Sequence, residues 1–224
     1  MSDQNTIYLD AAATTKPKPE VVEVVNKYLT EQWQNPSALY KDAVVVREAV
    51  EHARETVADY INAESDEIIF TSGGSESNSL AILGFMNQSM LDKKNTCFIT
   101  TPIEHKSVLL ARDFIENARF NRVKEVKVDR HGFVDIFSLV RTLEYTTTYY
   151  DDMRFLVSVQ MANNEIGTIQ DIARISKIVH EHGAYLHVDA VQAFGHIDID
   201  VQKLGVDMLS ASGHKIGAPK GSGF

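Results

Sequence analysis

The chain has 224 residues, of which 44% are hydrophobic and 24% charged, and its formal net charge is −9 at pH 7. This composition is typical of an ordinary globular protein with one sizeable core or two small ones. The negative charge disfavours nucleic acid or an anionic membrane as the main partner, because those partners bind clustered Lys and Arg. The apolar runs are too short to cross a bilayer and the first residues do not resemble a signal peptide, so we expect a cytoplasmic location without membrane attachment.

Helix and strand patterns alternate along the chain. Apolar residues recur at steps of three and four from Val46 to Ile61 and predict a helix, and another helix is predicted to begin near Ser75. Further helices are predicted near residues 106–118, 135–143 and 171–182. The predicted strands cover residues 67–71, 96–100, 123–128, 155–160, 184–189 and 207–211.

This alternation predicts an α/β protein with three layers, αβα, and a mostly parallel sheet. Residues 141–154 are predicted to form an exposed connection, because Thr, Tyr and Asp follow one another there. The single cysteine, Cys97, excludes an internal disulfide. Its place inside a predicted strand favours a buried, inert thiol over a nucleophile.

Polar residues follow several of the predicted strands, at the sheet edge where open α/β sheets bind ligands. The glycine-rich turn 72–78 runs into a helix, and its free N–H groups favour a phosphate cradled by Gly74 and Ser75. A helix cap at Ser75 without any ligand explains the same turn. His105 follows the strand 96–100, where an imidazole could stack on a planar cofactor and move protons. The stretch 162–167, with Asn163 and Asn164, follows the strand 155–160 and could offer an amide to a ring oxygen. Ordinary turn chemistry also explains both this stretch and His105.

Asp189 and Lys215 follow the last two predicted strands and indicate pyridoxal phosphate. This cofactor needs a carboxylate that keeps its pyridine nitrogen protonated and a lysine amine that forms a Schiff base. Asp189 suits the first task and Lys215 the second. The alternative is a solvated loop lysine and an aspartate that caps a helix.

Six motifs in order resemble those of the cysteine desulfurases, in particular the NifS/IscS-type branch. They are 8–15 (YLDAAATT), 70–78 (FTSGGSESN), 104–106 (EHK), 163–167 (NNEIG), 187–192 (HVDAVQ) and 212–215 (SGHK). These enzymes are class V aminotransferase-like proteins of pyridoxal phosphate fold type I. The resemblance implies a reaction that converts L-cysteine to L-alanine and passes sulfur, as an enzyme persulfide, to a sulfur-acceptor protein for iron–sulfur clusters or other products.

The resemblance also implies a role for each matching residue. Lys215 would carry the Schiff base and later transfer protons, and Asp189 would keep the pyridine nitrogen protonated. His105 would stack on the ring and act in acid–base steps. Asn164 and Gln192 would contact the ring on its hydroxyl side. The phosphate would be bound by Gly74, Ser75, Ser212 and His214.

The same resemblance divides the chain into an extended segment, residues 1–15, and a cofactor-binding large domain, residues 16–224. Relatives continue beyond the equivalent of Phe224 into a smaller domain that carries the persulfide-forming cysteine, and they form homodimers. We therefore expect this chain alone to lack sulfur transfer, to expose a strand edge with apolar surface, and to associate. A selenocysteine lyase, another class V aminotransferase and a non-catalytic fragment that binds a partner remain alternatives.

Overall fold

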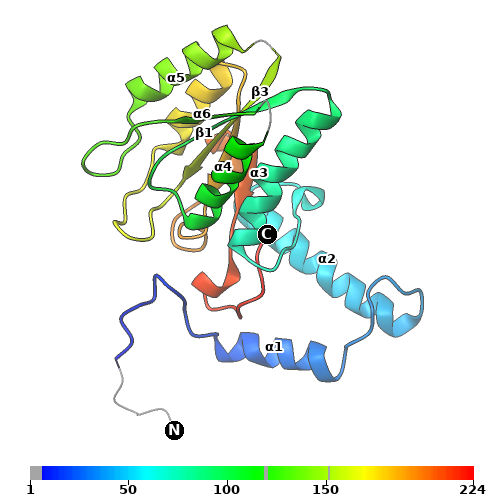
Figure 1. The fold of residues 1–224 in the computed structure, drawn as a ribbon. Coiled ribbons are helices and arrows are strands. Elements are labelled where there is room, and N and C mark those ends of the chain that lie inside the picture. Colours follow the sequence, from blue (N-terminus) through cyan, green and yellow to red (C-terminus); the bar gives the residue numbers. More distant parts are fainter. Residues whose placement is uncertain (1–6, 119–120, 151) are drawn as a thin grey trace.

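A parallel β-sheet forms the centre of the computed structural model, which describes residues 7–118, 121–150 and 152–224 (Figure 1). The strands are β1 (Asn95–Thr100), β2 (Arg122–Glu125), β3 (Met153–Gln160), β4 (Tyr185–Asp189) and β5 (Met208–Ser210). They lie in the order β2-β1-β3-β4-β5, and each neighbouring pair is parallel. Asp189 pairs in register with Gln160 on one side and Ser210 on the other. Three strand ends therefore lie level with one another at one edge of the sheet.

Two pairs of helices cover the two faces of the sheet (Figure 1). One pair consists of α3 (Gly74–Leu91) and α4 (Lys106–Asn117), and the other of α5 (Ile136–Tyr149) and α6 (Ile172–Glu181).

Apolar side chains of β1 point alternately to the two faces of the sheet, so helices must pack on both faces. Phe98 packs in a cluster with Ile82 of α3, whereas Cys97 and Ile99 belong to the opposite cluster with Leu139 of α5. Neighbouring strand residues point to opposite faces, so an apolar run buries one residue on each side. The predicted αβα architecture with a parallel sheet is confirmed.

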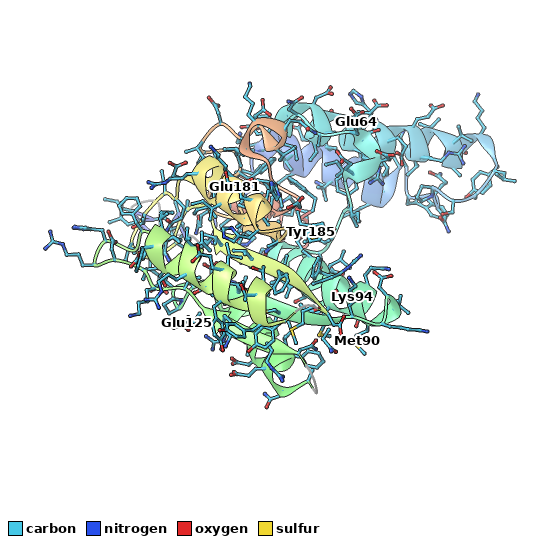
Figure 2. All side chains as sticks on the ribbon, turned by 90° about the horizontal axis from the view of Figure 1, so that it is seen from above. Glu64, Met90, Lys94, Glu125, Glu181 and Tyr185 are labelled. Atoms are coloured by element: carbon cyan, nitrogen blue, oxygen red, sulfur yellow. The ribbon has the colours of Figure 1, made fainter. Side chains whose placement is uncertain are left out.

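An arm built from α1 (Pro19–Thr30) and the first part of α2 (Lys41–Ile61) stands beside the layered body (Figure 1). The same arm lies to one side in the view from above (Figure 2). No residue of α1 is buried, and α2 packs in the main core cluster through Ala58 and Ile61 near its end, although Ala43 and Val46 are buried as well. The sequence interpretation contains no helix at 19–30, and it begins the next helix five residues too late. Three short elements remain: α7 (Val201–Leu204) and two 3-10 turns, at Ser65–Glu67 and Gly213–Lys215.

Two predicted segments differ from the structure. Residues 67–71 do not form a sheet strand: a 3-10 turn ends at Glu67, and Thr71 alone makes an isolated bridge, to Gly223. Residues 141–149 are not an exposed connection, because they continue α5 and bury Leu143 and Thr146. The Thr146 hydroxyl donates to the carbonyl of Thr142 one turn back, so a run of threonines remains helical. Asp151, inside the same predicted connection, and residues 1–6 of the predicted extended segment lie outside the described residues.

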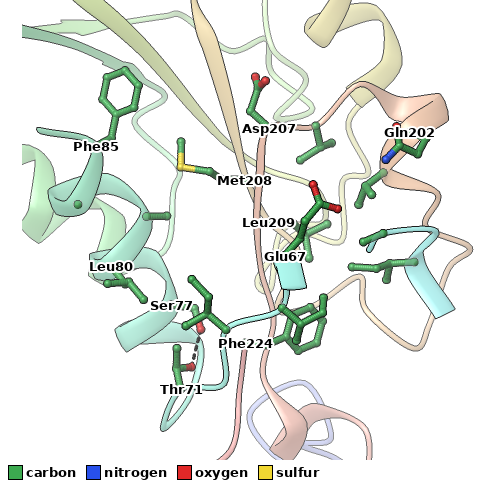
Figure 3. A pocket seen from close by; sticks show the side chains of 18 of the residues that line it. Glu67, Thr71, Ser77, Leu80, Phe85, Gln202, Asp207, Met208, Leu209 and Phe224 are labelled. Atoms are coloured by element: carbon green, nitrogen blue, oxygen red, sulfur yellow. Dashed lines mark hydrogen bonds between the residues drawn. The ribbon is translucent and has the colours of Figure 1, made fainter. Parts of the chain in front are cut away.

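Within the described ranges, β5 is an end strand of the sheet, and an apolar groove of about 490 Å³ lies against it (Figure 3). Leu80 and Phe85 of α3 line one side of the groove, and Met208, Leu209 and Phe224 line the other. The expected strand edge with apolar surface is therefore present. In the described part of the chain, no helix is long and apolar enough to cross a membrane.

We predict that this edge makes the chain associate in solution, because open edges and apolar grooves pair with one another. Ile69 and Leu80 are exposed and line the groove, so lysine at both positions should shift the protein toward monomers by charge repulsion. Light scattering on a size-exclusion column, at several concentrations, measures the change. Leu91→Lys is the matched control, since Leu91 is exposed but outside the groove. A monomeric unmodified chain at every concentration would contradict the prediction.

Candidate active site

All nine predicted site residues line one cavity of about 630 Å³ at the carboxyl edge of the sheet. They are Gly74, Ser75, His105, Asn164, Asp189, Gln192, Ser212, His214 and Lys215. A cavity of this size suits a small-molecule cofactor. The structure thus brings the nine residues together, while their individual roles stay predictions.

Asp189 ends β4 and is buried at the floor of the cavity. Its Oδ2 accepts a hydrogen bond of 2.8 Å from the Asn78 amide, and its Oδ1 accepts one of 3.0 Å from the backbone N–H of Val191. Burial raises the pKa of Asp189, whereas these two hydrogen bonds and the charges of His105 and Lys215 lower it. A carboxylate held this way favours a cationic or protonated partner in the cavity.

His105 is the N-cap of α4, and the helix fixes its ring. Nδ1 accepts from the backbone N–H of Ser107 at 3.2 Å and lies 2.7 Å from the Ser107 hydroxyl. When the ring is neutral, accepting that N–H bond leaves its proton on Nε2. The same Ser107 hydroxyl accepts from the Asn78 amide, which also donates to Asp189. A chain of hydrogen bonds through Ser107 and Asn78 therefore connects His105 to Asp189.

Lys215 reaches across the cavity to the N-terminal segment. Its Nζ donates to the carbonyl oxygens of Ala12 at 2.5 Å and Ala13 at 3.0 Å. The Gln192 amide donates to the same Ala12 oxygen at 2.7 Å. Burial lowers the pKa of Lys215, and the charges of Asp10 and Asp189 oppose that shift. The sequence interpretation assigns no site residue to this turn, although the motif at residues 8–15 is the signal that could have found it.

The first turn of α3 forms the other wall. Gly73 has a φ of +148°, which favours glycine, and a Cβ on Gly74 would lie 2.4 Å from Cγ2 of Val191. Glycine at position 74 therefore lets the helix start pack directly against the residues after β4. At that helix start, the Glu76 carboxylate accepts from the backbone N–H of Ser72 at 2.6 Å.

Ser212 lies against this helix start, since a Cβ on Gly74 would lie 3.5 Å from the Ser212 Cβ, and His214 lines the same cavity. The Ser212 hydroxyl is buried and has no hydrogen-bond partner among the described residues. Burial, followed by the charges of Lys215 and Lys220, lowers the pKa of His214. Lys220 also lines the cavity, a cation that sequence reasoning missed because it lies beyond the motif.

Asn164 lies on the side of the cavity nearest β3. Its Oδ1 accepts from the Gln160 amide at 3.1 Å, so its own amide N–H groups are the donors it can offer to a ligand. Gln160 is buried at the strand end and lines the cavity as well. The predicted amide donor is thus anchored by a second amide that the sequence interpretation did not include.

These residues fit pyridoxal phosphate on three independent observations. The helix start beside the unpartnered Ser212 hydroxyl suits a phosphate. The buried carboxylate of Asp189 suits a protonated ring nitrogen. The amine of Lys215 shares the same cavity and suits an aldehyde. By contrast, the described residues contain no group of three His, Cys, Asp or Glu side chains that could hold a metal ion.

Glu104, next to His105, is a buried carboxyl group that the sequence interpretation did not assign. It is only 6% exposed, and its Oε1 accepts from the Thr101 hydroxyl at 2.5 Å. Burial raises its pKa to about 8, helped by the charge of Asp189 and opposed by hydrogen bonds from Thr101 and the Gln160 backbone. Near neutral pH, Glu104 therefore keeps its proton in the folded chain.

We predict that Glu104→Gln makes the protein more stable at alkaline pH. Between pH 4.5 and 8 the unfolded chain releases the Glu104 proton and the folded chain retains it, so stability falls as the pH rises. The variant removes that loss and should gain roughly 2 kcal/mol or more at pH 8, since each pKa unit is worth about 1.4 kcal/mol. Urea unfolding at pH 5 and pH 8 measures the difference. Exposed Glu144→Gln is the control, and an equal gain there or no gain at Glu104 counts against the prediction.

Comparisons with known proteins identify the family of the chain. The family model for class-V aminotransferases matches residues 7–224. A cysteine desulfurase IscS of Dictyoglomus turgidum is 46% identical over 217 residues, which cover 97% of this chain and 52% of that protein. A cysteine desulfurase IscS of Methanosarcina thermophila is 42% identical over 224 residues, covering 99% and 52%. The chain thus spans about half the length of the curated relatives it matches.

Solved structures of related proteins have the same fold as this chain. A structure described as SspA in complex with cysteine superposes with a TM-score of 0.87 and 37% identity, covering 97% of this chain and 60% of that one. A NifS-like protein superposes with a TM-score of 0.87 and 36% identity, covering 97% and 57%. The resemblance to the cysteine desulfurases is confirmed. With the family model matched over nearly all the described residues, this chain belongs to the class-V aminotransferase family.

Proposed function

We propose that this chain is the pyridoxal phosphate-binding part of a cysteine desulfurase, which converts L-cysteine to L-alanine. The observation that carries the proposal is the single cavity in which buried Asp189, Lys215 and the unpartnered Ser212 hydroxyl meet. The names of the relatives support cysteine as the substrate, and so does the cysteine in one of the similar structures.

Each side chain has a task that follows from its surroundings. Pyridoxal phosphate, when bound, supplies an electron sink for charge that develops next to the amino group of the substrate. Asp189 holds a proton at the pyridine nitrogen, because a buried carboxylate stabilises a positive charge beside it. Lys215 binds the cofactor through Nζ and later moves a proton at the substrate α-carbon. Its lowered pKa favours the neutral amine that such bonding requires.

The remaining residues position the cofactor. Gly74 and Ser75 offer backbone N–H groups at the start of α3, and Ser212 and His214 add a hydroxyl and an imidazole to the phosphate. Asn164 and Gln192 bind the hydroxyl side of the ring through their amides. His105 stacks on the ring, and its Nε2, the atom left free by the bond from Ser107, moves protons.

Sulfur transfer needs a thiol that this chain does not offer in reactive form. The sulfur atom leaves the β-carbon of cysteine for a thiolate, forming a persulfide, while a proton takes its place and completes alanine. Cys97 is fully buried in β1, and burial raises the pKa of its thiol to about 12. We therefore propose that another thiol accepts the sulfur and passes it to an acceptor protein. Homodimer formation and a cytoplasmic location stay predictions of the resemblance.

We predict that Lys215→Ala abolishes the visible absorbance that pyridoxal phosphate acquires on binding. Without Nζ the cofactor cannot be held covalently, so it should also leave the protein on gel filtration. Absorbance of the protein after incubation with the cofactor and desalting measures both effects. Lys177→Ala, which removes an exposed lysine outside the cavity, should keep the band. An unmodified chain that is saturated with cofactor but shows no band would refute the proposal.

Product analysis separates the desulfurase from its alternatives. The loaded chain is incubated with L-cysteine and dithiothreitol, which supplies an accessible thiol, and alanine and sulfide are measured. Formation of both at equal rates, unchanged in Cys97→Ser, supports the proposed reaction. Activity with selenocysteine only indicates a selenocysteine lyase, and amino-group transfer to keto acids indicates another aminotransferase. Cofactor binding without any product fits a chain that needs the remainder of the length seen in its relatives.

A further inference from the structure

The turn at Asp10–Ala13 is a part of the cavity wall to which the proposed reaction assigns no task. The backbone N–H of Ala13 donates to the carbonyl of Asp10 at 3.0 Å and closes the turn. Tyr8 fixes the turn from outside: its hydroxyl lies 2.7 Å from the carbonyl oxygen of Asp10 and 3.0 Å from that of Thr14. The single phenol proton is thus shared between a carbonyl at the start of the turn and one directly after it.

The same turn directs two carbonyl oxygens at Lys215. Ala12 and Ala13 both accept from Nζ, and Ala12 also accepts from Gln192. A carbonyl oxygen can only accept, so both contacts engage N–H groups of Nζ, and their dipoles favour the protonated amine against the lowering of its pKa by burial. The protonated amine is the form that cannot attack an aldehyde.

The turn is also firmly joined to the segment that carries the lysine. The backbone N–H and the hydroxyl of Thr15 both donate to the carbonyl of His214 at 2.9 Å, and the N–H of Gly217 donates to the Thr15 hydroxyl at 2.7 Å. The two segments thus form a fixed frame, and Nζ spans the short gap between them.

We propose that the Asp10–Ala13 turn is a resting site for the amine of Lys215, with Tyr8 as the positioning residue that keeps its carbonyl oxygens in place. The turn holds Nζ whenever it is not bonded to the cofactor, so Nζ must leave Ala12 and Ala13 before it can bind the cofactor. This inference rests on the proposed function, because it gives Lys215 a second position in the same cavity.

The test measures how accessible the amine is in the absence of cofactor. Trace acetylation with acetic anhydride at constant pH, followed by peptide mass spectrometry, gives the reactivity of Lys215 relative to exposed Lys177 in the same molecule. Tyr8→Phe removes only the hydroxyl that ties the turn, and Tyr8 is itself 56% exposed, so the fold should survive. A single hydrogen bond is worth roughly a two- to tenfold change in population, and we expect Lys215 acetylation to rise by that factor.

Tyr40→Phe is the matched control, because Tyr40 has nearly the same exposure, 55%, and lies outside the cavity. It should leave the Lys215 ratio unchanged. Tyr8→Ala should reproduce the rise, and circular dichroism verifies that each variant is folded. In a second measurement, pyridoxal phosphate is added, and its uptake should be faster in Tyr8→Phe by a similar factor.

The two measurements separate the two claims. Unchanged acetylation in folded Tyr8→Phe and Tyr8→Ala overturns the resting site, even if cofactor binding is normal. Raised acetylation together with no cofactor uptake in any variant overturns the proposed function while leaving the contact between turn and amine supported. Raised acetylation with faster uptake supports both.

Discussion

A carboxylate at the end of a central strand can stay ionised only if its neighbours replace the water it has lost. Asp189 is in that position, and its neighbours come from two different helices and the loop after β4. Asn78 of α3 and the N–H of Val191 donate to it, while Ser107 of α4 orients Asn78. The helices on this face therefore cannot shift freely, because moving either one would leave a buried charge with fewer donors. The same contacts place His105 and the start of α3 around the cavity.

A row of polar side chains continues this constraint into the sheet. His187, two residues before Asp189 on the same face of β4, lies 2.8 Å from the hydroxyl of Ser158 and 2.9 Å from that of Ser210. Burial lowers its pKa to about 3, so the ring is neutral at physiological pH and links three neighbouring strands without adding a charge. A neutral link suits this position, since another cation below Asp189 would compete for the carboxylate that the proposed cofactor needs.

The sequence predicts those parts of the site whose structure is set by residues close together in the chain. Strand ends after 96–100 and 184–189 follow from apolar runs, and parallel strands bring such ends to one edge whatever the details. Residues 67–71 have the same apolar pattern, yet only Thr71 is paired, because strand formation depends on a partner along the whole run. Threonines 146–148 favour a loop by propensity, but packing of Leu143 and back-bonding hydroxyls retain the helix. The carbonyl oxygens of Ala12 and Ala13 have no side-chain signature, since any residue carries a carbonyl, and only the motif at residues 8–15 marks the turn.

The contacts that complete the cavity join residues far apart in the chain. Thr15 bonds to His214, Lys18 to Gly217 and Thr71 to Gly223. The residues that pair between β1 and β3 or between β3 and β4 are much closer together in the chain. Closing such long loops costs entropy that local elements do not pay, so the layers can form before the cavity does. The turn at residues 10–13 is attached only at this stage, and it is held by hydrogen bonds to the segment 214–217 rather than by a buried core. Under the proposed resting site, these hydrogen bonds, and not burial in a core, fix the position of the turn from which Nζ is released.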